Sequence, residues 1–184
     1  MIRTFLAVDF DGPFLDGVAA LAEGLRGAPR LSAARWAARE TLHTTLRFFG
    51  DTDDRQLAAL RAFVSELAAG TASFSVRAPW VHGFPARARA HVLVLDVAAG
   101  ELASLATRAE ARAVSLGFAA ESRPYHAHLT LARMRKEVDV SSFAAEAASL
   151  PLGHVTAITL YASSSSPDGV VYRALERAEL ALKS

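Results

Sequence analysis

The chain has 184 residues, of which 52% are hydrophobic and 21% charged, and its net charge is +1. This length and composition predict a folded protein of one domain or two small lobes, and exclude a disordered chain. The small net charge excludes a broad cationic surface, so any nucleic-acid substrate would be held locally. Cysteine is absent, which excludes disulfides, thiolate metal sites and a cysteine nucleophile.

The N-terminal apolar run is too short for a signal peptide and meets Asp9 and Asp11 at once. No segment approaches the roughly 20 apolar residues that a membrane-spanning helix needs. We therefore expect a cytoplasmic protein without a membrane partner.

The first half of the chain, residues 1–90, alternates predicted strands and helices. Ile2–Phe10 has the pattern of a strand, and Asp11 and Pro13 are typical of a turn that starts a helix ending at Gly27. The elements expected next are a connector over Leu31–Glu40, a strand over Leu42–Phe49 ended by Gly50, a helix capped by Thr52 and ending at Gly70, a strand over Ser73–Ala78, and a loop over Pro85–Ala90.

The second half, residues 91–184, repeats the order strand, helix, strand, helix, strand. Its expected elements are a strand over His91–Val97, a helix over Glu101–Leu116, a loop over Glu121–Tyr125, a strand that contains His128, a short helix over Ser141–Leu150, and a hairpin of Thr156–Ser163 and Val170–Leu180. This weak duplication predicts a single bilobal α+β domain over residues 1–184. We expect two antiparallel-type sheets with outer helices, related by a pseudo-twofold axis, and a cleft between the lobes.

One short motif occurs in both halves, as His43-Thr44-Thr45-Leu46 and as His128-Leu129-Thr130-Leu131. Chance gives only roughly 0.3 matches to His-x-Thr in this composition, and here leucine follows both times. Side chains alternate between the faces of a strand, so the histidine and the last threonine of each copy share one face. The motif therefore predicts a polar pocket lined by two imidazoles and two hydroxyls.

Two histidines in one pocket can divide acid and base roles, because a free imidazole has a pKa of about 6.5. Each threonine hydroxyl can donate a hydrogen bond to an anionic oxygen held between them. The reaction that suits this set is cleavage of a phosphodiester with a proton moved at each end of an in-line displacement. Such chemistry needs no metal and no cofactor, and we expect none.

The sequence resembles the two-histidine phosphoesterases, most closely the RNA 2′,3′-cyclic phosphodiesterases, also described as 2′-5′ RNA ligases. The resemblance is carried by residues 2–10, Arg35-Trp36, residues 42–50, Gly83-Phe84-Pro85 before the strand at 91–97, residues 123–133, and the segment 166–172. It departs at Ala127, where the family often has proline, and at Val94, where tryptophan is common.

This resemblance implies a bilobal fold and a role for each motif residue. His43 would be the proton donor to the departing ribose oxygen, and His128 the base that activates water. Thr45 and Thr130 would hold the cyclic phosphate. The product would be a 2′-phosphate end.

An arginine follows each tetrad. Arg133 falls on the opposite parity from His128, so it either contacts phosphate or braces the strand through an ion pair. Arg47 shares the parity of His43 but lies two pleats away, so it either reaches substrate or is exposed to solvent.

Residues before the second tetrad are further candidates. His126 and His128 have a spacing that a metal could use, but no carboxylate or cysteine is adjacent, so we expect His126 to border the cleft and contact substrate. Tyr125 either packs in the core or stacks on a base. Trp36 and Phe48 are expected in the core.

Three functions are consistent with these residues. The first is hydrolysis of RNA ends that carry a 2′,3′-cyclic phosphate. The second keeps the chemistry but acts on a nucleotide-derived cyclic phosphate, or runs in reverse as 2′-5′ RNA ligation. The third is RNA-end binding without turnover, against which the two complete tetrads argue. We expect a monomer.

Overall fold

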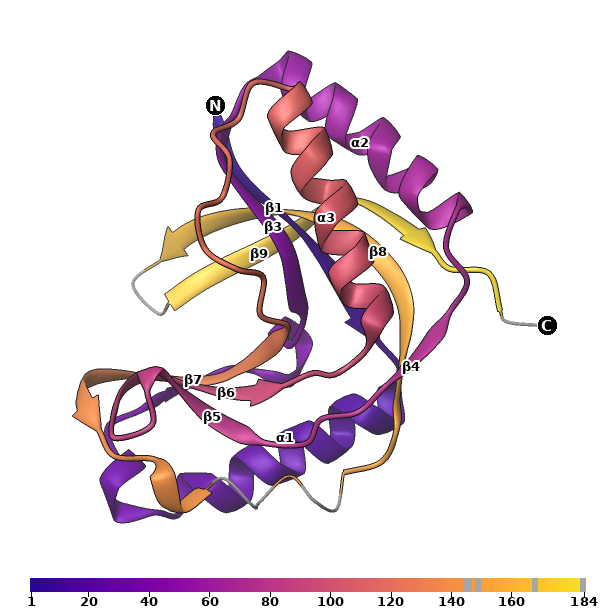
Figure 1. Ribbon diagram of the computed structural model, residues 1–184. Helices are drawn as coiled ribbons and strands as arrows, with labels where there is room; N and C mark the ends of the chain where they lie inside the picture. Colours follow the sequence, from indigo (N-terminus) through magenta and orange to yellow (C-terminus); the bar gives the residue numbers. More distant parts are fainter. Residues whose placement is uncertain (144–146, 148–149, 167–168, 183–184) are drawn as a thin grey trace.

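The structure, a computed structural model, describes residues 1–143, 147, 150–166 and 169–182. Over these residues the fold is α+β, with three α-helices and one antiparallel sheet of nine strands bent into two lobes (Figure 1). In spatial order the strands are β4 (Phe74–Val76), β8 (Gly153–Ser166), β1 (Ile2–Phe10), β3 (Thr44–Thr52), β7 (His128–Val138), β6 (Arg89–Asp96) and β5 (Val81–Ala86), with β9 (Gly169–Glu179) beside β8 and β2 (Arg35–Trp36) beside β7. No helix of this described part is long and apolar enough to cross a membrane.

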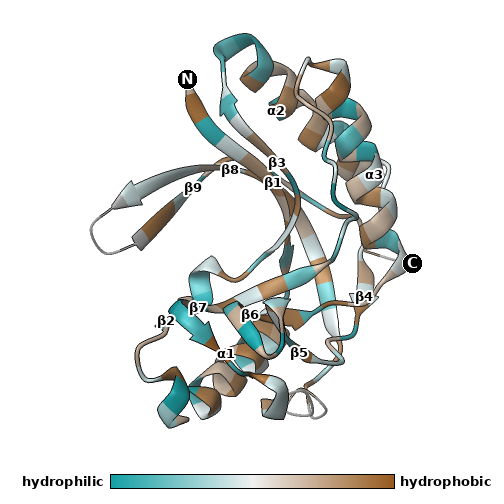
Figure 2. Cartoon of the chain, turned by 60° about the vertical axis from the view of Figure 1, so that its left-hand side comes forward, coloured by the Kyte–Doolittle hydropathy of each residue, from teal (hydrophilic) through white to brown (hydrophobic). Residues whose placement is uncertain are grey.

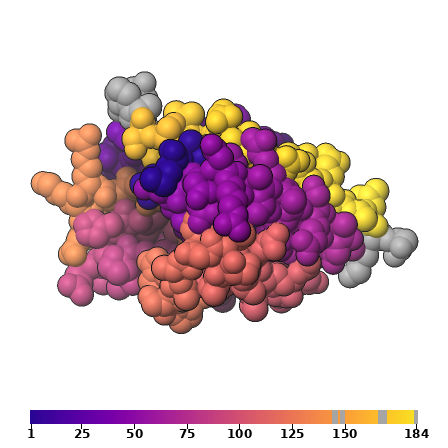
Figure 3. Space-filling view, turned by 90° about the horizontal axis from the view of Figure 1, so that it is seen from above, coloured from indigo at the N-terminus to yellow at the C-terminus, as the bar shows by residue number. Residues whose placement is uncertain are grey.

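The first lobe contains the longest strand, β8 (Gly153–Ser166), and its helices cover one face of the sheet (Figure 1). Its strands are β1 (Ile2–Phe10), β3 (Thr44–Thr52), β4 (Phe74–Val76), β8 (Gly153–Ser166) and β9 (Gly169–Glu179), and its helices are α2 (Asp54–Ala69) and α3 (Gly100–Ser115). The β8–β9 hairpin confirms the predicted closing hairpin; β8 is longer than predicted at both ends, and β9 is shifted by one residue. Seen from above, residues 100–125 lie against residues 40–65 (Figure 3).

The second lobe is smaller, and α1 (Gly12–Arg26) lies along it (Figures 1 and 2). Its strands are β2 (Arg35–Trp36), β5 (Val81–Ala86), β6 (Arg89–Asp96) and β7 (His128–Val138). Short 3₁₀ turns are η1 (Pro29–Leu31), η2 (Arg39–Thr41) and η3 (Ser141–Phe143). The halves of the chain are therefore not the lobes, because residues 1–90 supply α1, β2 and β5 here while α3, β8 and β9 belong to the first lobe.

The sheets expected for the two lobes are joined at one point. A single register pair, Thr44 with Leu129, connects β3 to β7. Both residues belong to the His-x-Thr-Leu tetrads. The backbone pairing between the lobes therefore brings the two tetrads together.

Each tetrad ends in a β-bulge at its leucine. The register between β1 and β3 skips Leu46, and the register between β6 and β7 skips Leu131. An extra residue in one strand reverses the alternation of side chains beyond it. Residues that follow the tetrads consequently point to the face opposite from the one that simple alternation predicts.

The burial of the tetrads confirms their predicted alternation. Leu46, Leu129 and Leu131 are buried in the hydrophobic core, whereas the histidines and the last threonine of each tetrad are partly exposed. The alternation thus places the polar side chains on one face and anchors each strand by the other.

Two predictions around β3 are wrong. The strand does not end at Gly50, which has a φ of +74° at a second bulge and lets β3 continue to Thr52. Thr52 is not the cap of α2, because its hydroxyl is paired with that of Thr4 at 2.6 Å. The cap is Asp53, whose side chain and that of Gln56 form a reciprocal capping box.

Two other segments differ from their predictions. The loop expected over Pro85–Ala90 is a tight connection, since Ala86 already pairs with Arg89 in the β5–β6 hairpin. The helix expected over Ser141–Leu150 begins as the 3₁₀ turn η3, and most of the remainder lies outside the described residues.

Candidate active site

The two tetrads meet at a cleft with a volume of about 790 Å³. Its lining includes Thr45 from β3 and His128, Thr130 and Arg133 from β7. Further walls come from α3, from the β5–β6 hairpin and from the loop that precedes β7. His43 lies two positions before Thr45 but packs among aromatic rings instead of lining the open space.

Both histidines are oriented by the same contact. The Nδ1 atom of His43 lies 2.7 Å from the carbonyl oxygen of Thr41, and that of His128 lies 2.8 Å from the carbonyl oxygen of His126. A carbonyl oxygen can only accept, so each Nδ1 carries a proton and donates it. In both rings Nε2 is therefore the atom left to exchange protons with a ligand.

Burial lowers the pKa of both histidines, because it disfavours the charged imidazolium. The hydrogen bond to the carbonyl opposes this in each case. Among the charges, Asp9 acts most on His43 and raises its pKa, whereas His126 acts most on His128 and lowers its pKa. The two rings therefore have the same tautomer but different electrostatic surroundings.

The surroundings of His43 are aromatic. Its ring centroid lies 5.0 Å from that of Phe5, 5.2 Å from that of Tyr172 and 5.9 Å from that of Tyr161. Tyr161 donates a hydrogen bond of 2.9 Å to the carboxylate of Asp9. Apolar rings thus enclose His43 while a carboxylate lies beyond them.

The surroundings of Asp9 hold its carboxylate in place. It also accepts hydrogen bonds from the Thr159 hydroxyl at 2.6 Å and from the Arg177 guanidinium at 3.2 Å. An aspartate inside the apolar run of β1 was the available sequence signal for this network, which sequence reasoning missed.

Arg133 faces the cleft, although simple alternation predicts the opposite face. The bulge at Leu131 is the reason, because it reverses the alternation between Thr130 and Arg133. No carboxylate forms an ion pair with Arg133 among the residues that the structure describes. Its charge lowers the pKa of both histidines.

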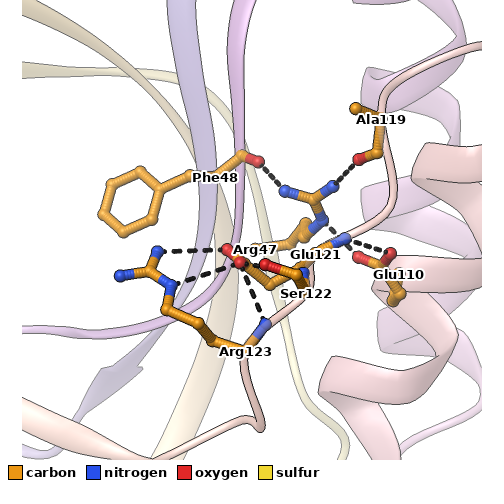
Figure 4. Close-up of polar contacts among 7 residues, drawn as sticks. All are labelled: Arg47, Phe48, Glu110, Ala119, Glu121, Ser122 and Arg123. Atoms are coloured by element: carbon orange, nitrogen blue, oxygen red, sulfur yellow. Dashed lines mark hydrogen bonds and ion pairs between the residues drawn. The ribbon is translucent and has the colours of Figure 1, made fainter.

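Arg47 is turned away from the histidine face by the corresponding bulge at Leu46. Its guanidinium pairs with Glu110 of α3 and donates to the carbonyl oxygens of Phe48 and Ala119 (Figure 4). With a side chain only 10% exposed, Arg47 anchors the loop after α3, so the alternative of a solvent-exposed residue is wrong. Arg47 also lines the cleft, and its contact with substrate stays a prediction.

Phe48 takes the place on the histidine face of β3 that alternation assigns to Arg47. Its ring lines the cleft, lies 5.5 Å from that of Phe5, and is 60% exposed. The expectation that Phe48 lies in the core is therefore wrong. Trp36 does pack against the core, with the Arg26 guanidinium 5.7 Å above its ring.

His126 and Tyr125 both line the cleft, as predicted for His126. His126 Nε2 lies 2.8 Å from a carboxylate oxygen of Asp96, an acidic residue within the apolar strand β6 that sequence reasoning also missed. Burial raises the pKa of the Tyr125 phenol. Across the described ranges, no group of three or more His, Asp or Glu side chains is placed to hold a metal ion.

The comparison with protein families agrees with this site. The model of LigT-like phosphoesterases matches residues 8–94 and again residues 95–172, one match in each half. The chain belongs to the LigT-like phosphoesterase family. The resemblance to the two-histidine phosphoesterases is thereby confirmed, and the chain is an enzyme.

Individual relatives of this phosphoesterase support the assignment. It is 29% identical over 181 residues to a Methanothermobacter thermautotrophicus protein, covering 95% of this chain and 97% of the relative. A Bacillus subtilis protein is 30% identical over 123 residues, covering 66% of this chain and 67% of the relative. Both relatives are named RNA 2′,3′-cyclic phosphodiesterase.

Solved structures share the fold of this phosphoesterase. The protein TT0787 of Thermus thermophilus superposes with a TM-score of 0.81 at 24% identity, over 100% of both chains, which shows the fold alone. E. coli LigT complexed with 3′-AMP superposes with a TM-score of 0.72 at 26% identity, over 98% of both chains. The predicted α+β fold class is therefore confirmed.

Proposed function

We propose that this phosphoesterase hydrolyses the 2′,3′-cyclic phosphate ends of RNA to 2′-phosphomonoesters, with two histidines as acid and base and without a metal. The observation that carries the proposal is the matched pair of Nδ1–carbonyl hydrogen bonds, which leaves Nε2 as the exchangeable atom in both tetrads. The names of the relatives from M. thermautotrophicus and B. subtilis support the substrate.

The proposed step is a single in-line displacement. Nε2 of neutral His128 takes a proton from water as the water oxygen attacks phosphorus. The bond from phosphorus to O3′ breaks, and Nε2 of protonated His43 gives its proton to O3′. The products are a 2′-phosphate and a 3′-hydroxyl, and each histidine ends in the protonation state in which the other began.

The remaining polar groups of the site would stabilise the charged phosphate. The hydroxyls of Thr45 and Thr130 would donate to its non-bridging oxygens, and Arg133 would supply positive charge. None of these groups needs to move a proton. Their contribution is to hold the phosphate between the two imidazoles.

The nearest charges differ between the two rings in the sense that the assignment of acid and base requires. Asp9 favours the protonated form of His43, which a proton donor requires, while burial, His128 and Arg133 act against that form. Burial, His126 and Arg133 favour the neutral form of His128, which a base requires, and Asp96 acts against it. A bound phosphate dianion or diester anion would further raise the pKa of a nearby imidazole.

The size and walls of the cleft favour a nucleotide over a small phosphate ester. A volume of about 790 Å³ is larger than a phosphate needs, and Phe48 and Tyr125 offer aromatic rings in it. Every nucleobase can stack on such rings, whatever its sequence. The monomeric state and the cytoplasmic location stay predictions.

The test uses metal-stripped protein in EDTA and an oligoribonucleotide that ends in a 2′,3′-cyclic phosphate. Phosphorus NMR would identify the product. We expect a 2′-phosphomonoester from the wild type and from His154→Ala, an exposed histidine on β8 outside the cleft lining, and little product from His43→Ala or His128→Ala. A 3′-phosphate product, a metal requirement, or full activity in either motif variant would overturn the proposal.

A further inference from the structure

The loop between α3 and β7 contains a cluster of hydrogen-bond donors around one carboxylate. Oε1 of Glu121 accepts from the backbone amide of Ser122 at 3.1 Å, the backbone amide of Arg123 at 3.3 Å and Nε of Arg123 at 3.3 Å. Oε2 of Glu121 accepts from a terminal guanidinium nitrogen of Arg123 at 3.3 Å (Figure 4). Two consecutive amides and a guanidinium therefore converge on one anionic group.

Such a set of donors is chemically suited to phosphate. Consecutive backbone amides form anion-binding concavities, and the planar guanidinium matches two oxygens of a phosphate as well as those of a carboxylate. Glu121 thus occupies a place where a phosphate diester would find the same partners. The carboxylate of Glu121 differs from a free anion in being covalently attached to the same loop.

The pair of Glu121 and Arg123 is easily exchanged for another anion. The side chain of Arg123 is 83% exposed and that of Glu121 is 35% exposed. Exposed ion pairs contribute little because water screens the charges. Replacing the carboxylate by a phosphate of an incoming ligand therefore costs little.

The backbone of the loop, in contrast, is fixed from outside. Glu110 of α3 accepts a hydrogen bond of 2.9 Å from the amide of Glu121. Arg47 of β3 pairs with Glu110 and donates to the carbonyl oxygen of Ala119 at 2.5 Å. The backbone directly before the two amides of the cluster is thus held in position, while the Glu121 side chain that fills the cluster is attached only within the loop, as far as the described residues show (Figure 4).

The cluster lies on the wall of the cleft that holds the tetrads. Glu121 and Arg123 line the cleft together with His128 and Thr130. Arg123 lies five positions before His128, and an extended chain of that length spans at most about 18 Å. An RNA chain whose end is at His128 has its preceding phosphates within that range.

We propose that the amides of Ser122 and Arg123 and the Arg123 guanidinium form a second phosphate subsite, which binds the diester phosphate preceding the terminal cyclic phosphate, and that Glu121 fills it until RNA arrives. This inference rests on the proposed function and names its substrate more closely. A subsite for a second phosphate selects an RNA chain over a cyclic mononucleotide.

The first test compares a dinucleotide ending in a 2′,3′-cyclic phosphate with the corresponding cyclic mononucleotide. We expect Arg123→Gln to lower kcat/KM for the dinucleotide about tenfold more than for the mononucleotide, as loss of a charged hydrogen bond predicts. Glu121→Gln removes the competing charge and should raise kcat/KM for the dinucleotide selectively. Arg108→Gln, which removes an exposed arginine of α3 outside the cleft lining, is the matched control and should change neither.

The second test needs no turnover. Binding of an oligoribonucleotide with a non-cyclic 3′-phosphate is measured from about 50 to 200 mM salt, where each phosphate contact to a single strand contributes about −0.7 to the slope of log K against log salt. Arg123→Gln should reduce the magnitude of the slope by about that amount, and Arg108→Gln should not.

The outcomes separate the two proposals. If Arg123→Gln affects both substrates equally or neither, and leaves the salt slope unchanged, the subsite is overturned while hydrolysis of cyclic ends stands. If the wild type hydrolyses neither substrate, the proposed function fails, and the salt slope still decides whether Arg123 binds a phosphate.

Discussion

The strands β3 and β7 carry the same tetrad on the same backbone geometry but present different side chains beyond it. Both histidines donate from Nδ1 to a carbonyl two residues upstream, and both leucines form a bulge. After the bulge, β3 turns Phe48 into the cleft, whereas β7 turns Arg133 into it. Strand β3 therefore presents an aromatic ring to the cleft, and strand β7 presents a positive charge.

The surroundings of the two imidazoles differ in the same sense. His43 is enclosed by Phe5, Tyr161 and Tyr172, with Asp9 beyond them. His128 lines the open cleft beside Phe84, whose ring centroid is 5.3 Å away. A repeated backbone motif can thus fix the tautomer of both rings while neighbouring side chains give them different surroundings, on which the proposed acid and base roles rest.

The largest expected effect is on the activity of the two histidine variants, which should respond differently to a change of leaving group. His43→Ala and His128→Ala should each lower kcat by about 10²–10⁴-fold on an ordinary cyclic phosphate. When sulfur replaces O3′, the departing thiolate needs no proton, so His43→Ala should recover most of its activity. His128→Ala should stay impaired on both substrates. Single-turnover rates with the oxygen and sulfur substrates measure the difference.

The contrary result is also informative. Recovery of His128→Ala instead of His43→Ala by the sulfur substrate would exchange the acid and base assignments. Equal recovery of both variants would mean that neither assignment follows from the surroundings of the rings.

The next effect concerns the threonines. Thr45→Val and Thr130→Val each remove a hydroxyl from the cleft and should lower kcat/KM by about 10- to 100-fold, the range expected for a hydrogen bond to a charged group. Thr44→Val is a matched control in the same tetrad, because Thr44 is fully buried and its hydroxyl has no hydrogen-bond partner within the described structure. It should leave kcat/KM unchanged and raise the free energy of unfolding by about 1 kcal/mol. Steady-state kinetics and urea titration test both statements.

A smaller effect is expected at the ring that β3 contributes. Phe48→Ala should weaken binding of an oligoribonucleotide about tenfold, since stacking of one base on an aromatic side chain is worth about 1–3 kcal/mol. Trp80→Ala removes another exposed aromatic residue, outside the cleft lining, and is the control. Equal binding by wild type and Phe48→Ala in a fluorescence titration would remove Phe48 from the substrate site.

The smallest effect is on the pH dependence of stability. Both histidines have a lowered pKa in the folded protein, so the unfolded chain binds more protons below its own pKa of about 6.5. Their contribution to stability is complete above that pH and is lost as the pH falls through the folded values. The free energy of unfolding should therefore fall less between about pH 7.5 and about pH 5 in His43→Ala and His128→Ala than in the wild type. If the free energy of unfolding fell by the same amount in the variants and in the wild type, the lowered pKa of the histidines would be contradicted.

Local pattern was enough to predict the tetrads, most of the strands and the side of each strand that is buried. Alternation and the repeated order of elements do not depend on distant contacts, which is why they were readable. The register of the sheet could not be predicted from local pattern. Strand β4 pairs with β8 from the other half of the chain, and a pairing between such distant segments leaves no local signal.

The bulges explain the site residues that pattern alone misplaced. An extra residue at Leu46 and at Leu131 is visible only against a partner strand, yet it decides the faces of Arg47, Phe48 and Arg133. The ion pair of Arg47 depends likewise on α3 lying beside β3, since its partner Glu110 is 63 positions away in sequence. Alternation therefore held within each tetrad and failed immediately after it.

The single register pair of Thr44 and Leu129 has a mechanical consequence. Within the described sheet the lobes share this one pair, so a relative rotation about it would displace residues in proportion to their distance from it. His43 and His128 are each one residue from the joint, so rotation of the lobes would move them least and would widen the outer cleft most. Under the proposed function, ligands of different bulk would then enter the outer cleft while the two imidazoles keep their relative position.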